Sequence, residues 1–253
     1  MYEKELELAV TAAKEGARVL SAQGPVRIDS EQGKDIKLSA DKESERAIVG
    51  VLRAGSDAPI LSEECGLLEG RGEQDLRWIV DPLDGTANHL KGLTELTCVS
   101  VALWKGDRPV LGVVYRYAAH ELYCGVVGEG AWCNGQAIAP SQVTQVGRAV
   151  LATGFPVRRD YSAQSLSGFI RQIQCFKKVR MLGAAAIMGT FVAAGRVDAY
   201  MEDHIMLWDV AAAAAIATAS GAAVSVQELG EGACVCKIFA NRALMEDLDA
   251  QGL

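Results

Sequence analysis

Two acidic residues stand three positions apart in a segment that must turn sharply. Asp81 follows the apolar run Trp78-Ile-Val, Pro82 comes directly after it, and Asp84 and Gly85 follow. Proline lacks the N–H that strand pairing needs, and glycine permits a tight turn. We expect this turn to direct both carboxylates into one small volume. The residues after Gly85 are predicted to begin a helix, whose free N–H groups favour an anion such as phosphate.

Other acids also stand at the ends of predicted elements. Glu63 follows the short strand Ala58-Pro-Ile-Leu-Ser, and Asp209 introduces an alanine-rich helix. Taken alone, the pair Asp81 and Asp84 is explained as a capped turn, and Asp209 as a helix cap. Acids at several element ends favour another interpretation, because carboxylate oxygens are the ligands that Mg²⁺ prefers. The sequence therefore predicts a magnesium site.

Hydrolysis of a phosphate monoester is the chemistry that such a site suits. Two divalent ions can lower the pKa of a bound water and stabilise the leaving oxygen of an in-line displacement. Other hydrolytic chemistries lack their motifs, since the chain has only His89, His120 and His204, and neither H-E-x-x-H nor G-x-S-x-G occurs. We expect Glu63 to accept a proton from the attacking water.

The elements that must position these acids follow from residue spacing. Apolar residues at helical spacing, a pattern that indicates a buried helix face, predict helices over residues 3–21 (ending near Gly24-Pro25), 42–54 (opening after Asp41), 164–175, 184–194 and 210–220. β-Rich segments predict strands at residues 58–62, 77–80, 97–104, 109–115, 121–127, 150–152 and 198–201, with a final strand near 222–226.

The order of these elements predicts two fused subdomains. Short turns between residues 97 and 127 indicate an antiparallel meander, whereas helices and strands alternate in the second half. We expect residues 1–140 to form an α+β subdomain with most metal ligands. Residues 141–253 are expected to form an α/β subdomain that supplies Asp209 and substrate contacts.

Composition excludes several classes of function. A net charge of −7 over 253 residues argues against nucleic-acid binding, which needs a basic patch. The longest apolar run, residues 210–217, is far shorter than the ~20 residues that cross a membrane. Seven cysteines without framework spacing indicate reduced thiols. We therefore expect a cytoplasmic protein whose partner is a small phosphorylated metabolite, with no nucleic acid and no membrane.

Three segments, in their order and spacing, resemble the inositol monophosphatase family. They are Leu61-Ser-Glu-Glu, Trp78-Ile-Val-Asp-Pro-Leu-Asp-Gly-Thr-Ala-Asn and the helix that begins Trp208-Asp-Val-Ala. The turn-rich Gly128-Glu-Gly-Ala-Trp-Cys-Asn-Gly also resembles the family. The resemblance implies an α/β (α+β) fold, a layered αβαβα sandwich of the sugar-phosphatase type. It also implies a homodimer, two or three Mg²⁺ ions per site and sensitivity to lithium.

The resemblance assigns roles to individual residues. The implied metal ligands are the side chains of Glu63, Asp81, Asp84 and Asp209 and the backbone carbonyl of Leu83. The implied substrate contacts are Asp84, Gly85, Thr86, Ala185, Glu202 and Asp209, where the amides of Gly85 and Thr86 hold phosphate and Glu202 contacts hydroxyls. The implied catalytic residues are Glu63, Thr86 and Asp41, where Asp41 hydrogen-bonds Thr86 so that its hydroxyl orients the attacking water.

Departures from the family pattern surround the predicted ligands. His89 stands where an aromatic residue usually follows Asn88, and Thr94-Glu95-Leu96 replaces an aromatic-Pro-aromatic stretch. The usual Asp-x-Val-Thr-x-x-Asp reads here Asp35-Ile-Lys-Leu-Ser-Ala-Asp41. These changes leave the metal chemistry intact and open the choice of substrate.

Several substrates and one other class of function stay open at this stage. The leading prediction is hydrolysis of inositol monophosphate or a related polyol or sugar phosphate. The same metal chemistry would serve 3′-phosphoadenosine 5′-phosphate, fructose 1,6-bisphosphate or histidinol phosphate, since a fold does not select among them. A non-catalytic protein that binds a metal or a partner is the alternative of another class. The retention of Glu63, Asp81, Asp84, Thr86 and Asp209 argues against it.

Overall fold

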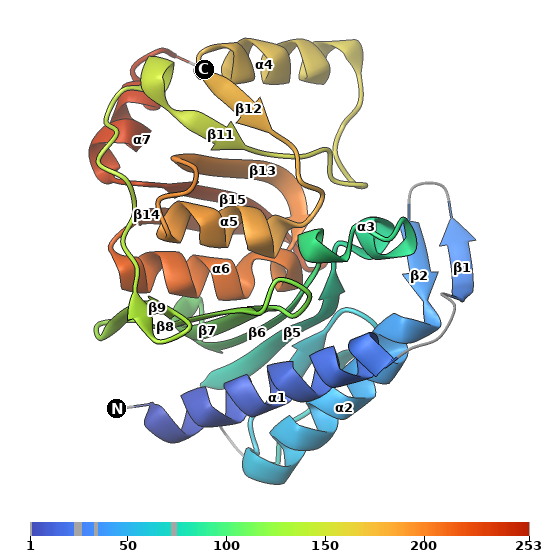
Figure 1. Cartoon of the computed structure of the whole chain (residues 1–253). Helices are drawn as coiled ribbons and strands as arrows, with labels where there is room; N and C mark the ends of the chain where they lie inside the picture. The colour runs from blue at the N-terminus through green and yellow to red at the C-terminus, as the bar shows by residue number, and fades with distance from the viewer. Residues whose placement is uncertain (1, 23–26, 33–34, 72–74, 253) are drawn as a thin grey trace.

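The chain folds into alternating layers of helix and sheet, αβαβα, as the resemblance implied (Figure 1). The computed structural model describes residues 2–22, 27–32, 35–71 and 75–252. The first helical layer consists of α1 (Glu3–Ala22) and α2 (Ser39–Gly55). α5 (Ala185–Ala193) and α6 (Leu207–Ser220) form the central layer, and α4 (Ala163–Gln174) and α7 (Arg242–Asp249) the outer one.

The first sheet comes from the first half of the chain and has the strand order β10-β9-β8-β7-β6-β5-β3-β4. Its strands run antiparallel except that β3 lies parallel to β5, so the predicted meander is confirmed. The bounds are β3 (Ile60–Ser62), β4 (Gly66–Leu68), β5 (Leu76–Asp84), β6 (Cys98–Lys105), β7 (Arg108–Arg116), β8 (Glu121–Val126), β9 (Gly130–Cys133) and β10 (Gln136–Ala137).

The second sheet comes from the second half and has the order β12-β11-β13-β15-β14. Strand β11 lies parallel to β12 and β13, whereas β13, β15 and β14 pair antiparallel. The bounds are β11 (Val150–Ala152), β12 (Lys178–Arg180), β13 (Ala199–Met206), β14 (Ala223–Gly230) and β15 (Ala233–Phe239). The remaining elements are the hairpin β1 (Ile28–Gln32) and β2 (Asp35–Leu38), α3 (Thr86–Leu90) and the 3₁₀ turns η1 (Thr94–Leu96) and η2 (Val146–Arg148).

Helical periodicity explains the first layer. The buried residues of α1 recur every three or four positions, from Ala9 through Ala13 and Ala17 to Leu20, and they pack against the first sheet. In the part of the chain that the structure describes, no helix is both long enough and apolar enough to cross a membrane. The predicted helix end near Gly24-Pro25 lies outside the described residues.

The central helix α6 is buried on all sides because it lies between the two sheets. Its residues from Val210 to Ala217 are all fully buried and contact both sheets. Close approach to the first sheet depends on glycines: a Cβ on Gly112 of β7 would lie 2.3 Å from the Ala212 carbonyl oxygen, and one on Gly125 of β8 would lie 2.7 Å from the Ile216 Cα. Small residues on both sides therefore fix how near α6 sits to the sheet.

Several predicted boundaries were wrong in ways that matter for the site. Helix α2 begins at Ser39, so Asp41 lies within its first turn rather than before it. Asp209 likewise lies in the first turn of α6, which begins at Leu207, and is not the N-cap. Strand β5 continues through Pro82 to Asp84, where pairing with β6 resumes after an irregularity. β14 is not the last strand, because β15 follows and pairs with both β13 and β14.

The two sheets separate near residue 140, but the central layer joins them. Residues before 140 supply the first sheet and residues after it supply the second. However, α5 and α6, from the second half, share one apolar core with strands of both sheets. The division into subdomains 1–140 and 141–253 therefore stays a prediction.

Replacing Gly112 with alanine should destabilise the fold. The added methyl would collide with the backbone of α6, and overpacking of this kind costs about 1–3 kcal/mol of unfolding free energy. Urea denaturation followed by circular dichroism measures the loss. The matched control is Gly50→Ala on α2, where no atom lies within 4 Å of the added methyl and alanine should add about 0.5–1 kcal/mol. Equal stability of the two variants would show that α6 does not depend on this close approach.

Candidate active site

One cavity of about 500 Å³ gathers nearly all the predicted site residues. It lies where the carboxyl end of β5 meets the amino ends of α5 and α6. Among the predicted residues, the cavity is lined by Glu63, Asp81, Leu83, Asp84, Gly85, Thr86, Ala185, Glu202 and Asp209. Asp41 is the predicted residue outside this lining. Segments more than 140 positions apart in the sequence thus meet at one site.

The end of β5 has a geometry that directs its acids inward. The Leu83 N–H donates to Asp81 Oδ1 at 2.9 Å, which closes a local turn across Pro82. Gly85 then adopts a φ of +91°, in the left-handed region that favours glycine. A Cβ there would lie 2.8 Å from the Leu96 carbonyl oxygen. The glycine is therefore required both for the turn and for its close packing.

Asp84 is held by the amino end of α5. Its Oδ1 accepts the Ala185 N–H at 3.2 Å and its Oδ2 accepts the Ala186 N–H at 2.8 Å. The buried Cys98 thiol lies 3.6 Å from Oδ2. Helix N–H groups and the helix dipole stabilise a carboxylate. Neither Ala186 nor Cys98 was predicted, because contacts with residues 102 and 14 positions away along the chain leave no local signal.

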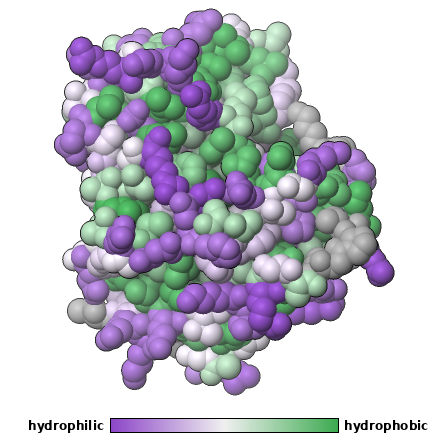
Figure 2. Space-filling model, in the orientation of Figure 1, coloured by the Kyte–Doolittle hydropathy of each residue, from purple (hydrophilic) through white to green (hydrophobic). Residues whose placement is uncertain are grey.

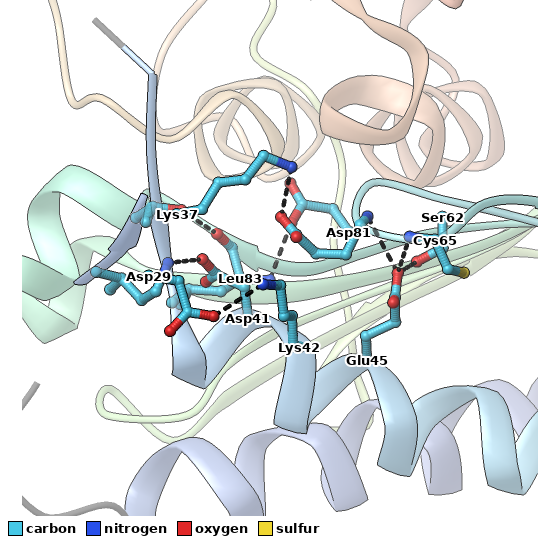
Figure 3. A network of polar contacts seen from close by, with 12 residues as sticks. Asp29, Lys37, Asp41, Lys42, Glu45, Ser62, Cys65, Asp81 and Leu83 are labelled. Carbon is cyan, nitrogen blue, oxygen red and sulfur yellow. Dashed lines mark hydrogen bonds and ion pairs between the residues drawn. The ribbon is translucent and has the colours of Figure 1, made fainter. Parts of the chain in front are cut away.

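A buried acid on α2 holds the segment that carries Glu63. Glu45 Oε1 accepts hydrogen bonds from the Ser62 hydroxyl, from the Glu64 N–H at 3.1 Å and from the Cys65 N–H at 3.2 Å (Figure 3). The Glu63 N–H donates to the Val80 carbonyl at 3.3 Å. Glu45 was not predicted. Its spacing from Asp41, four positions along one helix face, was a signal that could have indicated it.

A lysine also lies on the cavity wall. The Lys37 side chain reaches from β2 toward the carboxylates beside Asp81 (Figure 3), and its Nζ lies 2.9 Å from Glu64 Oε1. Lys37 is a position at which the chain departs from the family pattern.

The expected hydrogen bond between Asp41 and Thr86 is not formed. Asp41 Oδ2 instead accepts the Leu38 N–H at 2.7 Å, because Asp41 lies in the first turn of α2 and bonds back to its N-cap. Among the residues that the structure describes, its buried Oδ1 has no hydrogen-bond partner. The Thr86 hydroxyl donates to the Leu83 carbonyl at 3.1 Å. The Leu83 carbonyl that the resemblance assigns to a metal is thus occupied by Thr86.

Glu202 and Asp209 approach the cavity from the second sheet and the central layer. Glu202 is buried on β13, and a Cβ on Gly154 would lie 2.7 Å from its Oε1, so the glycine makes room for the carboxyl. Asp209 Oδ2 accepts the Met206 N–H at 3.3 Å. Phe155 and Val157 also line the cavity, and their exposed fractions are 45% and 54%. Figure 2 shows hydrophobic residues gathered on the upper part of the molecular surface.

Crowding and burial raise the pKa of the acids in the cavity. Burial, and then the charges of Asp41 and Glu64, raise the pKa of Glu63 to about 8, and the positive charge of Lys37 opposes this rise. Burial raises the pKa of Asp84 to about 7. Burial and the charge of Glu63 raise the pKa of both Asp81 and Asp209 well above the ordinary value. Neighbouring positive charge therefore compensates the ionised forms of these carboxylates only in part.

The carboxylate oxygens suit a hard cation such as Mg²⁺, although they are not arranged at the spacing of a formed metal site. Within the described ranges, no three His, Cys, Asp or Glu side chains stand at the spacing of a metal site. The cavity nevertheless offers five carboxyl groups. Burial, and then the neighbouring negative charges, raise the pKa of Asp81 and Asp209, and the charge of a divalent ion would oppose both effects. The residues Glu63, Asp81, Asp84 and Asp209 thus fit magnesium by chemistry.

Comparison with known proteins gives the same family as the residues. The model of the inositol monophosphatase family matches residues 1–246. A relative called Nus factor SuhB from Pasteurella multocida is 37% identical over 226 residues, covering 87% of this chain and 84% of its own length. The protein of the same name from Escherichia coli strain K12 is 33% identical over 227 residues, with the same coverage.

Solved structures agree. An inositol monophosphatase from Anabaena has a TM-score of 0.84 and 28% identity, covering 99% of this chain and 96% of its own. The Thermotoga maritima IMPase TM1415 has a TM-score of 0.80 and 27% identity, with 98% and 96% covered. The family match over nearly the whole chain supports phosphatase chemistry. The chain belongs to the inositol monophosphatase family.

Proposed function

We propose that the protein hydrolyses phosphate monoesters of small polyols or sugars, with inositol monophosphate as the leading substrate class and magnesium as cofactor. The observation that carries this proposal is the convergence of Glu63, Asp81, Asp84 and Asp209 on one cavity that Glu202 also lines. The acids would hold two or three Mg²⁺ ions, together with the Leu83 carbonyl. Magnesium, when bound, supplies positive charge that activates water and offsets the charge of the leaving oxygen.

The protein's own groups have definable roles in this reaction. The amides of Gly85 and Thr86 bind phosphate oxygens, and Glu63 accepts the proton of the attacking water. The Thr86 hydroxyl orients that water once the Leu83 carbonyl no longer accepts from it. The unpartnered Oδ1 of Asp41 is the acceptor proposed to hold the hydroxyl in its new position. Ala185 and Glu202 contact the alcohol part of the substrate.

Other properties implied by the resemblance belong to the same proposal. They are a homodimer, a cytoplasmic location and inhibition by lithium. The fit of a neutral, hydroxylated ring follows from the chemistry of Glu202, whose carboxyl can exchange hydrogen bonds with substrate hydroxyls. Burial and then the charge of Asp84 raise the pKa of Glu202 to about 8, so this position disfavours a further negative charge, and a second phosphate there would cost free energy.

Asp84→Asn should remove Mg²⁺-dependent phosphate release from inositol 1-phosphate. The change deletes a proposed ligand charge and places an amide where two backbone N–H groups donate, so we expect a loss of kcat above the ~100-fold that outer-shell changes reach. The matched variant Cys98→Ala touches Asp84 but keeps its charge, and should lose less than about tenfold. Urea denaturation tests that both variants fold. Wild-type kcat in Asp84→Asn at ordinary magnesium concentrations would overturn the ligand assignment.

The stability of the metal-free protein should fall as pH rises. The pKa of Glu202 is about 8 in the folded protein, against an ordinary 4.5, and that of Glu63 is also about 8. Between pH 4.5 and about pH 8, these two carboxyl groups bind more protons in the folded state than in the unfolded chain. The free energy of unfolding therefore decreases with pH, by up to about 1.4 kcal/mol per pH unit for each group.

Urea denaturation in EDTA and in magnesium, at several pH values between 4.5 and about 8, tests this coupling. Magnesium should stabilise the protein more at the upper end, where the ligands lose protons readily. Glu202→Gln, which removes one titrating group, should flatten the slope measured in EDTA. A metal-free protein that becomes more stable across this range would contradict the proposed crowding.

Glu202→Gln should change substrate selectivity more than phosphoryl transfer itself. We expect wild-type kcat/KM to be higher for inositol or sugar monophosphates than for 3′-phosphoadenosine 5′-phosphate. The variant should lose part of this preference but keep most of its activity on p-nitrophenyl phosphate, which offers no hydroxyls to position 202. A wild-type preference for the nucleotide, or unaltered selectivity in the variant, would reject the polyol assignment.

A further inference from the structure

Lys37 places a positive charge on the wall of the acidic cavity. Its Nζ lies 2.9 Å from Glu64 Oε1, and the side chains of Lys37 and Glu64 are 31% and 4% exposed. The lysine comes from β2, where the usual pattern Asp-x-Val-Thr carries valine. A charged residue thus stands at a position where the family pattern has an apolar one, and its side chain lines the cavity together with Glu63.

The hairpin that carries Lys37 is fastened next to the site. Asp29 of β1 accepts hydrogen bonds from the Ser39 hydroxyl at 2.5 Å and from Lys42 Nζ at 2.8 Å, both at the start of α2 (Figure 3). β2 leads directly into that helix and so connects to Asp41. Lys37 therefore extends from a strand that is continuous with α2, and the paired strand β1 is hydrogen-bonded to the start of that helix.

The negative charges of the carboxylates and of a bound phosphate exceed the positive charge that two Mg²⁺ ions would supply, and a lysine reduces this excess. Five carboxyl groups line the cavity, those of Glu63, Asp81, Asp84, Glu202 and Asp209. Two Mg²⁺ ions would offset at most four of their negative charges. A phosphate monoester then brings about two more negative charges at neutral pH, and Glu64 stands at the same edge. The effect of Lys37 reaches beyond its ion pair, because its charge also opposes the raised pKa of Asp41.

We propose that Lys37 is a tethered cation of the phosphate site. Its ammonium supplies positive charge beside Glu63 and Glu64 when the phosphate monoester binds. Additional magnesium can replace this charge. The proposal rests on the proposed function, because it assumes that phosphate and magnesium occupy this cavity. It assigns Lys37 to binding phosphate and to the magnesium requirement, not to proton transfer. Lys37→Met should accordingly raise KM and the half-saturating magnesium concentration more than it lowers kcat.

Calorimetric titration with inorganic phosphate tests the proposal without turnover. At a magnesium concentration that just saturates the wild-type protein, Lys37→Met should bind phosphate about tenfold more weakly, the effect of one partly screened charge pair. A tenfold increase in magnesium should restore most of the affinity. Lys37→Arg should stay near wild type because it keeps the charge. Unchanged phosphate affinity in Lys37→Met, or a loss that magnesium does not restore, would overturn the proposal.

Two further variants test whether Lys37 acts through its charge or only through its ion pair with Glu64. Lys105→Met removes an exposed lysine at the end of β6, outside the cavity lining, and it should behave as wild type. Glu64→Gln breaks the Lys37 ion pair but keeps the ammonium, so phosphate should bind no more weakly than in wild type. If Glu64→Gln reproduces the loss of Lys37→Met, the pair is structural and the proposal fails.

The same measurements distinguish failure of this inference from failure of the proposed function. Wild-type protein that neither binds phosphate in magnesium nor releases it from inositol 1-phosphate would overturn both. Wild-type protein that does both, beside a Lys37→Met variant indistinguishable from it, would overturn the role of Lys37 alone.

Discussion

Mutual repulsion among carboxylates in one enclosed cavity is the constraint on which the surrounding structure depends. An isolated buried charge is costly unless hydrogen bonds or a counter-ion compensate it. The fold supplies such compensation acid by acid: Asp84 accepts two N–H groups of α5, and Asp81 accepts the Leu83 N–H. Glu45 gathers three donors and so fastens the Glu63 segment. Burial, and then the neighbouring acids, still raise the pKa of Glu63 and Asp81, so these hydrogen bonds compensate the carboxylates only in part.

The same constraint links the site to the packing of α6. Asp209 occupies the first turn of a helix that lies between two sheets, so its position follows from how closely that helix approaches each of them. Gly112 and Gly125 permit that approach on the side of the first sheet. Substitutions far from the cavity can therefore move a proposed ligand, because a close-packed interior transmits displacement.

The sequence predicted the acids and the layers because both leave local signals. The turn Asp81-Pro-Leu-Asp84-Gly and the alanine-rich helix after Asp209 are readable in a few residues each, and the order of elements indicated the layered fold. Partners such as Ala186 and Cys98 left no comparable signal, because their contacts depend on tertiary arrangement, and Glu45 left only its helical spacing from Asp41. Boundaries failed where an acid bonds back to its helix start, as Asp41 and Asp209 do.

At two positions where the family pattern has aromatic residues, this chain forms polar contacts instead. His89 replaces an aromatic residue, and its Nδ1 lies 3.0 Å from the Tyr117 hydroxyl, which also accepts a hydrogen bond from Thr97 at 3.0 Å. These three side chains are buried, so each needs the partner that the others provide. The Glu95 carbonyl similarly accepts from Arg116. These contacts join His89, Tyr117 and Thr97 to one another and Arg116 to Glu95 and Glu121, and they do not involve the acids that line the cavity. The rim of the site can therefore vary while the arrangement of Glu63, Asp81, Asp84 and Asp209 is kept.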